Sequence, residues 1–209
     1  MYERILPARC SGSWSVGSML VLMAIRKVRL LGDPVLRSKC NLVDDPASPA
    51  IRIVADDLLD TFEDLQKMGG GGGLSASQIG APIQLIYIVL EGPAVMVNPE
   101  IVDIGADDFL YWDSCASFSN LLVRVQRAFH VVVRYQDLEG KTCEVEAEGP
   151  RAQLLQHEID HLDGLLAIDL ALGFDPFCLR EEWDEHHSEE GRHSEPYPRI
   201  GPAHPEFRF

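Results

Sequence analysis

The chain has 209 residues, which is enough for one domain with a substantial buried core. Its formal net charge is −15 and no run of Lys and Arg stands out, so the composition argues against a protein that follows the phosphate backbone of nucleic acid. The longest apolar run is far shorter than the about 20 residues that span a bilayer, so we expect no membrane-spanning helix.

The first segment, residues 1–24, is rich in Ser and Gly and shows no hydrophobic periodicity. The segment that begins at Met23, MAIRKVRLLGDPVLR, resembles the first residues of a protein. We therefore interpret residues 1–24 as an extension and expect a cytoplasmic protein. In the alternative interpretation residues 1–22 are a transit peptide, since Arg4 and Arg9 stand against a single acidic residue. The protein would then reside in a mitochondrial or plastid matrix.

An amphipathic helix is expected to begin after Ser48 and to end near Met68. Ser48 is a favourable capping residue, and Pro49 follows it at the first helical position. Apolar residues then recur at helical spacing, at Ile51, Val54, Leu58, Phe62 and Leu65. We expect this helix to pack against the core and to have no further role.

The middle of the chain reads mainly as strands. The glycine run at residues 69–73 disfavours regular structure and lets another group approach the backbone closely. Strand-like segments follow at 84–90, 94–97 and 130–136, and the last of these is joined to KTCEVEAE by a turn at residues 137–140.

A second helix is expected to open at Gly149-Pro150 and to end at Gly164. Since strands precede this helix and do not alternate with helices, the sequence predicts an α+β fold. Residues 181–209 are rich in charge, His and Pro and lack periodicity, which predicts a disordered tail.

The second helix carries the pattern His-Glu-x-x-His, at His157, Glu158 and His161. Two histidines one helical turn apart project from one face, so both imidazoles can bind the same metal ion. Glu158 lies beside the first of them, close enough to take a proton from a water molecule that the ion activates.

A catalytic site of this kind usually has a third protein ligand. The metzincin pattern would need histidine at position 167, which is Ala167, so that class is excluded. A downstream carboxylate, as in thermolysin-like enzymes, would be Glu181 or Glu182. The upstream candidate is Cys115, because a thiolate and two imidazoles suit Zn²⁺ or Fe²⁺.

Three segments occur in one order along the chain: GGGLSASQIG at 71–80, DSCAS at 113–117 and QHEIDH at 156–161. Together they resemble the peptide deformylases, whose signatures are GxGxAAxQ, EGCLS and HExxH. The segments GDPVLR and VNPEI resemble further parts of that family. The resemblance covers roughly residues 25–180, which we expect to form the catalytic domain, between the extension 1–24 and the tail 181–209.

The resemblance implies that Cys115, His157 and His161 hold one divalent metal ion. In the family this ion is commonly Fe²⁺, and Zn²⁺ or Ni²⁺ is also found. The resemblance further implies that Glu158 is the general acid and base. The expected fold is the family's α+β arrangement, in which antiparallel strands surround the helix that carries HExxH.

The other site residues also follow from the resemblance. Gln78 and the backbone N–H of Ala116 would stabilise the oxyanion, while Gly71 and Gly73 leave space for the substrate backbone and Ser114 lies beside it. The expected activity is removal of the formyl group from the N-terminal formyl-methionine of nascent polypeptides. A partner implied by that role is the ribosome, near its exit tunnel.

Several residues depart from the family pattern. Asp113 replaces Glu, Ser114 replaces Gly and Ala116 replaces Leu in EGCLS, while Ser75 replaces the first Ala of the glycine-rich motif. Asp113 keeps a carboxylate on a shorter side chain and could orient a neighbour such as Arg127. These changes leave the three metal ligands intact and bear on specificity and rate. The alternative functions are a zincin-type endopeptidase and a deformylase-like protein that binds without catalysis.

Overall fold

A computed structural model of the protein describes residues 24–186 and 193–197. The expectations for the extension up to residue 23, including the transit-peptide alternative, therefore lie outside the described residues, as does much of the tail. None of the helices in the described part of the chain has the length and apolar character of a bilayer span.

The larger of two antiparallel sheets has five strands in the order β1-β2-β3-β6-β7. Their bounds are β1 (Gly73–Ser75), β2 (Leu85–Val89), β3 (Pro93–Ile104), β6 (His130–Gln136) and β7 (Thr142–Glu148). The strands predicted at 84–90 and 130–136 agree with β2 and β6, and the turn between β6 and β7 is the expected one, with Gly140 at φ +79°.

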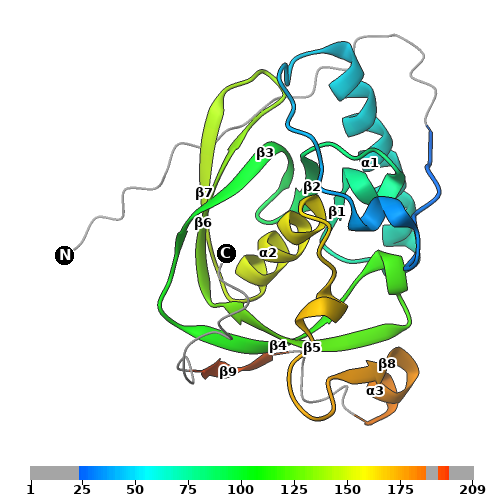
Figure 1. The fold of residues 1–209 in the computed structure, drawn as a ribbon, viewed down its shortest axis with the longest axis vertical. Coiled ribbons are helices and arrows are strands. Elements are labelled where there is room, and N and C mark those ends of the chain that lie inside the picture. The colour runs from blue at the N-terminus through cyan, green and yellow to red at the C-terminus, as the bar shows by residue number, and fades with distance from the viewer. Residues whose placement is uncertain (1–23, 187–192, 198–209) are drawn as a thin grey trace.

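The smaller sheet has the order β8-β5-β4-β9. Its strands are β8 (Phe177–Leu179), β5 (Leu121–Ala128), β4 (Asp108–Ser114) and β9 (His193–Tyr197). In Figure 1 β4 and β5 run across the base of the molecule, below the end of the larger sheet, and β8 and β9 lie at the two edges.

Helix α1 (Pro49–Lys67) begins and ends where the sequence predicts. Ser48 has extended backbone angles at the cap and Pro49 occupies the first turn, as expected for a helix start. Leu58 and Phe62 are buried on its inner face and pack against β1 and β2 in one hydrophobic cluster. As predicted, α1 contributes to the core, but the expectation that it has no further role is wrong, because Phe62 and Leu65 also line the pocket described below.

Helix α2 (Pro150–Leu162) lies between the two sheets and contacts strands of both (Figure 1). Its residues Ala152, Leu155 and Leu162 are buried against the inner side of the larger sheet. Gly164 ends the helix region at φ +76°, where a Cβ atom would lie 2.8 Å from the backbone of Arg37, so only glycine fits. The predicted α+β fold, with antiparallel strands around this helix, is confirmed.

Two described segments after residue 179, 180–186 and 193–197, form regular structure largely within the region that the sequence predicts as a disordered tail. Arg180–His186 form helix α3, and His193–Tyr197 form β9, which pairs with β4. The physical reason for α3 is Trp183, which is only 5% exposed and packs against Trp112 with ring centroids 5.2 Å apart. One large buried aromatic side chain fixes a helix whose other residues look like a solvated tail.

Candidate metal and catalytic site

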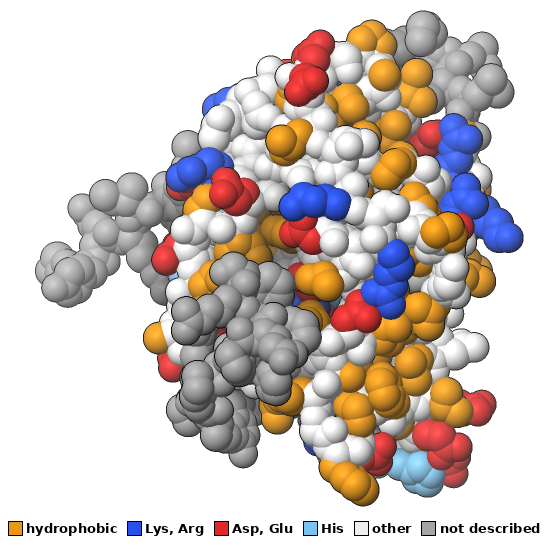
Figure 2. Space-filling view, in the orientation of Figure 1, with side chains coloured by type: hydrophobic (Ala, Val, Ile, Leu, Met, Phe, Trp, Pro, Cys, Tyr) orange, Lys and Arg blue, Asp and Glu red, His pale blue; other side chains and the backbone are white. Residues whose placement is uncertain are grey.

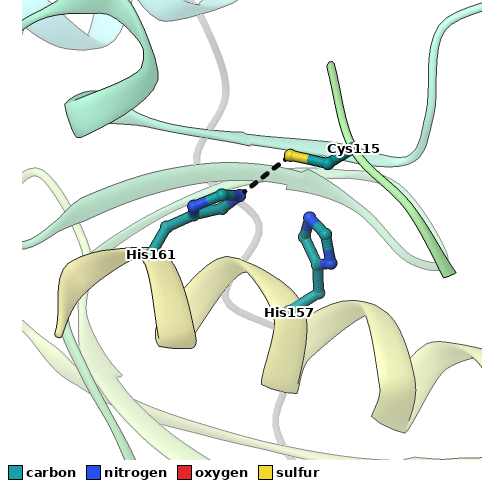
Figure 3. A group of neighbouring side chains, drawn as sticks. All are labelled: Cys115, His157 and His161. Atoms are coloured by element: carbon teal, nitrogen blue, oxygen red, sulfur yellow. Dashed lines mark hydrogen bonds between the residues drawn. The ribbon is translucent and has the colours of Figure 1, made fainter. Parts of the chain in front are cut away.

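Three side chains meet at the centre of the molecule. His157 and His161 project from one face of α2, and Cys115 follows β4, where it caps a short 3-10 turn at 116–118. Their ligand atoms all lie within 4.8 Å of one another, and all three residues are buried. Figure 3 shows the thiol and both imidazoles pointing toward one another, with Sγ of Cys115 3.3 Å from Nε2 of His161.

The alternative third ligands do not join this group. Glu181 and Glu182 lie on α3, and Glu182 pairs with His186 on the surface. Within the described residues, Cys115 and the two histidines are the one group of three potential ligands that the structure brings together. The upstream candidate is thus the residue that lies beside the two histidines.

The residues of this group fit a single metal ion. One thiol and two imidazoles form a donor set that suits Zn²⁺ or Fe²⁺. Nδ1 of His157 is 2.9 Å from the carboxylate of Asp113, so its Nε2 is left to face the centre of the group. A carboxylate behind a ligand histidine is the usual device that fixes the ring and raises its basicity.

Asp113 is the electrostatic centre of the site. Burial alone would raise its pKa, but the charges and hydrogen bonds of His157 and Arg127 outweigh burial and lower the pKa to about 2. The same contact raises the pKa of His157 against the effect of burial. Among the described residues His161 has no such carboxylate partner, and burial together with the nearby charge of His157 lowers its pKa well below the ordinary value.

Arg127 is the partner of Asp113 that the sequence suggested. Its Nη2 atom lies 3.3 Å from Oδ2 of Asp113, and Nη1 donates to Asp160 of α2. The guanidinium is almost fully buried, so two carboxylates hold a charge that is kept out of water. The arginine thereby connects β4, β5 and α2 directly behind the predicted metal ligands.

Glu158 points from α2 into the same region and is 3% exposed. Burial is the main reason why the pKa of its carboxyl group is raised to about 7. Its Oε2 atom has no hydrogen-bond partner among the described residues. A Cβ atom on Gly73 would lie 2.8 Å from Oε1 of Glu158, so glycine at this position makes room for the carboxylate.

Gln78 is held in a fixed orientation beside Cys115. Its Oε1 atom accepts hydrogen bonds from the backbone N–H of Ser75, at 3.0 Å, and from the Ser75 hydroxyl, at 3.3 Å. Its Nε2 atom donates to Sγ of Cys115 and to the hydroxyl of Ser117. The amide N–H groups are therefore directed toward the predicted ligand Cys115 and its neighbour Ser117, on the side of the site where an oxyanion donor is expected.

A pocket of about 680 Å³ opens over these residues. The predicted site residues on its wall are Gly71, Gly73, Gln78, Ser114, Cys115, Ala116, His157 and Glu158. A Cβ atom on Gly71 would meet nothing within 4 Å, so that residue borders open space as expected. Apolar side chains from α1 and α2, namely Phe62, Leu65 and Leu154, form another part of the wall.

Among the polar pocket residues that the sequence did not single out are Asn120 and Arg180. Neither belongs to a motif, and Arg180 reaches the pocket only because β8 pairs with the start of β5. Arg180 stands at the edge of an acidic segment without hydrophobic periodicity, so the neighbouring residues do not indicate that it lies at the pocket.

An HExxH helix enclosed by antiparallel strands, with a cysteine beside its two histidines, is an arrangement suited to a hydrolase with a single metal site. A family model described as polypeptide deformylase matches residues 25–174. The chain therefore belongs to the polypeptide deformylase family, whose members remove the N-formyl group from nascent peptides, and it is a hydrolase of that kind.

Individual relatives support this assignment. The chain is 36% identical over 149 residues to a peptide deformylase of Dictyoglomus thermophilum, and the aligned region covers 71% of this chain and 94% of the relative. It is 40% identical over 153 residues to one from Mesorhizobium japonicum, with 70% and 84% covered.

Solved structures agree with the fold. Thermotoga maritima peptide deformylase superposes with a TM-score of 0.66 at 31% identity, covering 71% of this chain and 99% of that one. A Synechococcus elongatus peptide deformylase in complex with actinonin gives 0.68 at 29% identity, covering 86% and 93%.

Proposed function

We propose that deformylation takes place in the pocket described above, with Cys115, His157 and His161 as the ligands of one Fe²⁺ ion; Zn²⁺ or Ni²⁺ is the alternative. The observation that carries this proposal is the convergence of three buried ligand atoms from two distant segments within 4.8 Å of one another. An ion bound there would supply Lewis acidity toward the formyl carbonyl and toward water.

Glu158 is the proposed general base and acid. Water adds to the formyl carbon and gives up a proton to the Glu158 carboxylate. When the C–N bond breaks, the same proton passes to the departing amine, which leaves formate and a free N-terminus. A carboxyl group whose pKa is raised by burial to about 7 exchanges protons readily at neutral pH.

Gln78 and the backbone N–H of Ala116 are the proposed donors to the oxyanion that develops on the formyl oxygen. The support for Gln78 is its fixed amide, since Ser75 holds Oε1 from two donors and thereby directs Nε2 toward Cys115. Such a donor needs little reorganisation when negative charge develops on the oxygen. Electrostatic stabilisation of a transition state is effective for this reason.

Gly71, Gly73 and Ser114 are the proposed contacts of the substrate backbone, because all three border the pocket.

We further propose that the catalytic domain spans residues 25–180, between the extension 1–24 and the tail 181–209. The first residues of this tail, in α3, pack against the domain through Trp183. Action on nascent chains also supports a location near the ribosomal exit tunnel, in the cytoplasm or, if residues 1–22 are a transit peptide, in an organelle matrix.

The test is formate release from formyl-methionyl peptides by protein purified anaerobically with Fe²⁺, beside the variant Glu158→Ala. We expect the parent to release formate, and the variant to keep its ion while losing roughly 10²- to 10⁴-fold in rate, the range typical of a lost general base. Acetyl-methionyl peptides serve as the control substrate.

The proposal fails if fully metallated parent protein releases no formate from any formylated peptide. Cleavage of internal peptide bonds, with loss of the ion on replacing Glu181 or Glu182 by Ala, would instead indicate an endopeptidase. Specific binding of formylated peptides without turnover would indicate a non-catalytic relative.

A further inference from the structure

Arg180 lies on the wall of the pocket, although it stands outside the residues 25–174 that the family model matches. It is the first residue of α3 and directly follows β8. Because β8 pairs with the start of β5, Leu179 lies opposite Leu121, and Arg180 is brought beside the segment that leads away from Cys115. The contact is thus a property of this chain's own C-terminal segment.

Arg180 is held in place by the fold. Its backbone N–H donates to the carbonyl oxygen of Asn120 at 2.9 Å, and its Nε donates to the carbonyl oxygen of Ser119, also at 2.9 Å. One turn further along α3, Trp183 is buried against Trp112 and anchors the helix. A guanidinium fixed at Nε by a backbone carbonyl loses less conformational entropy when a ligand binds.

The charge of Arg180 is the second part of the argument. Among the described residues that line the pocket, Arg180 is the only Lys or Arg. The carboxylate of Asp113 is already bonded to Arg127 and His157, and the Glu158 carboxylate, which also lines the pocket, packs against Gly73. Within the described residues no carboxylate forms an ion pair with Arg180, so its charge is available to a group that enters the pocket.

We propose that Arg180 binds a carboxylate of the peptide substrate, in one of the two residues that follow formyl-methionine. In a nascent chain this group is an Asp or Glu side chain, and in a short peptide it can also be the terminal carboxylate. An arginine fork matches the geometry of a carboxylate, and an extended peptide advances about 3.3 Å per residue, so successive residues run along the pocket wall. The inference rests on the proposed use of this pocket for formylated peptides.

The test compares peptides that differ only in one charge. Formyl-Met-Ala-Asp-amide is set against formyl-Met-Ala-Asn-amide, and formyl-Met-Asp-Ala-amide against its Asn counterpart. Formyl-Met-Ala-Asn with a free carboxyl terminus separates the terminal from the side-chain carboxylate. The metallated full-length protein is assayed for kcat/KM beside Arg180→Ala, Arg180→Lys and Arg180→Glu. Arg134→Ala, which removes an exposed arginine of the larger sheet, is the matched control.

We expect the parent and Arg134→Ala to prefer the Asp peptide by roughly two- to fivefold at one of the two positions, the range for a partly exposed ion pair. Arg180→Ala should abolish this preference, Arg180→Lys should keep part of it, and Arg180→Glu should reverse it. Damage to the fold lowers kcat/KM for both members of a pair equally, so the ratio reports the contact itself.

An equal Asp-to-Asn ratio in the parent and in Arg180→Ala, at both positions, would overturn the inference. Binding of the same peptides to metallated Glu158→Ala, with and without Arg180→Ala, is measured by calorimetry as an arm that needs no turnover. If the parent releases no formate but Arg180 still sets the binding preference, the proposed function fails while this inference stands.

Discussion

Asp113 shows how one residue carries the charge balance of the site. It stands where the family signature has Glu, one methylene longer, yet its Oδ2 atom reaches both Nδ1 of His157 and Nη2 of Arg127. Both partners offer an N–H group or a positive charge to this carboxylate, so one buried oxygen atom can interact with His157 and Arg127 at the same time. The shorter side chain therefore still supports His157, the proposed ligand.

Cys115 is the residue whose replacement most directly tests the metal site. Cys115→Ala removes the thiol and leaves His157 and His161, fewer protein ligands than catalytic sites usually have. We expect bound metal to fall from about one ion per chain to well below half of that. The measurement is metal content by elemental analysis after gel filtration of protein purified anaerobically.

Cys178→Ala is the matched control, because Cys178 is a free cysteine on β8 and belongs to no group of potential ligands. It should retain the metal content of the parent. Unchanged stoichiometry in Cys115→Ala would show that the third ligand is another residue.

At the scale of secondary-structure elements, the Arg127 cluster connects β4, β5 and α2 through Asp113 and Asp160. Arg127→Ala would leave two carboxylates buried or nearly buried without their shared cation. Breaking a buried ion pair from one side typically costs about 3–5 kcal/mol, so the free energy of unfolding should drop by about that amount. Chemical denaturation followed by circular dichroism measures the change.

Arg134→Ala provides the comparison within the same protein. Arg134 pairs with Glu144 across β6 and β7, and both side chains are about half exposed. Exposed pairs contribute about 0–1 kcal/mol, so this variant should unfold close to the parent. Equal losses in the two variants would contradict the view that burial gives the Arg127 cluster its importance.

Some helices and strands can be predicted from their own sequences and others cannot. Helix α1 and strands β2 and β6 follow from periodicity and caps, because one physical pattern dominates each segment. Strands β4 and β5 were not predicted, since buried charges interrupt their apolar alternation, as Asp113 and Arg127 show. The two side chains form their ion pair only in the folded protein. The sequence of one strand therefore does not show that its buried charge has a partner on the other strand.

At the scale of the whole molecule, the pocket joins parts of the chain that are far apart. The order of the glycine-rich, cysteine and HExxH motifs is readable along the sequence, so the candidate ligands Cys115, His157 and His161, which the structure brings together, could be predicted from the sequence together with Glu158 and Gln78. Arg180 could not, because its place depends on the pairing of β8 with β5. Figure 2 shows apolar side chains on the lower part of this face, where β8 and α3 lie in Figure 1, and Phe174, Phe177 and Leu179 of that segment are exposed.

Trp183 tests whether α3 holds Arg180 at the pocket. Trp183→Ala removes the aromatic contact with Trp112, and loss of a buried Trp costs about 3–5 kcal/mol where the structure cannot adjust. Because α3 is a short helix whose buried residue is Trp183, we expect the loss to appear as local opening. Amide hydrogen exchange over residues 180–186 should quicken, and the Asp-to-Asn ratio should fall toward one while kcat/KM for the Asn peptide changes little.

Phe174→Ala is the control, because the Phe174 side chain is fully exposed and its removal should alter neither quantity. Trp183→Phe keeps an aromatic ring against Trp112 and should restore most of the protection. If exchange quickens in Trp183→Ala while the Asp-to-Asn ratio stays at the parent value, the position of Arg180 depends on β8 and its two hydrogen bonds to residues 119–120, and α3 contributes nothing to substrate selection.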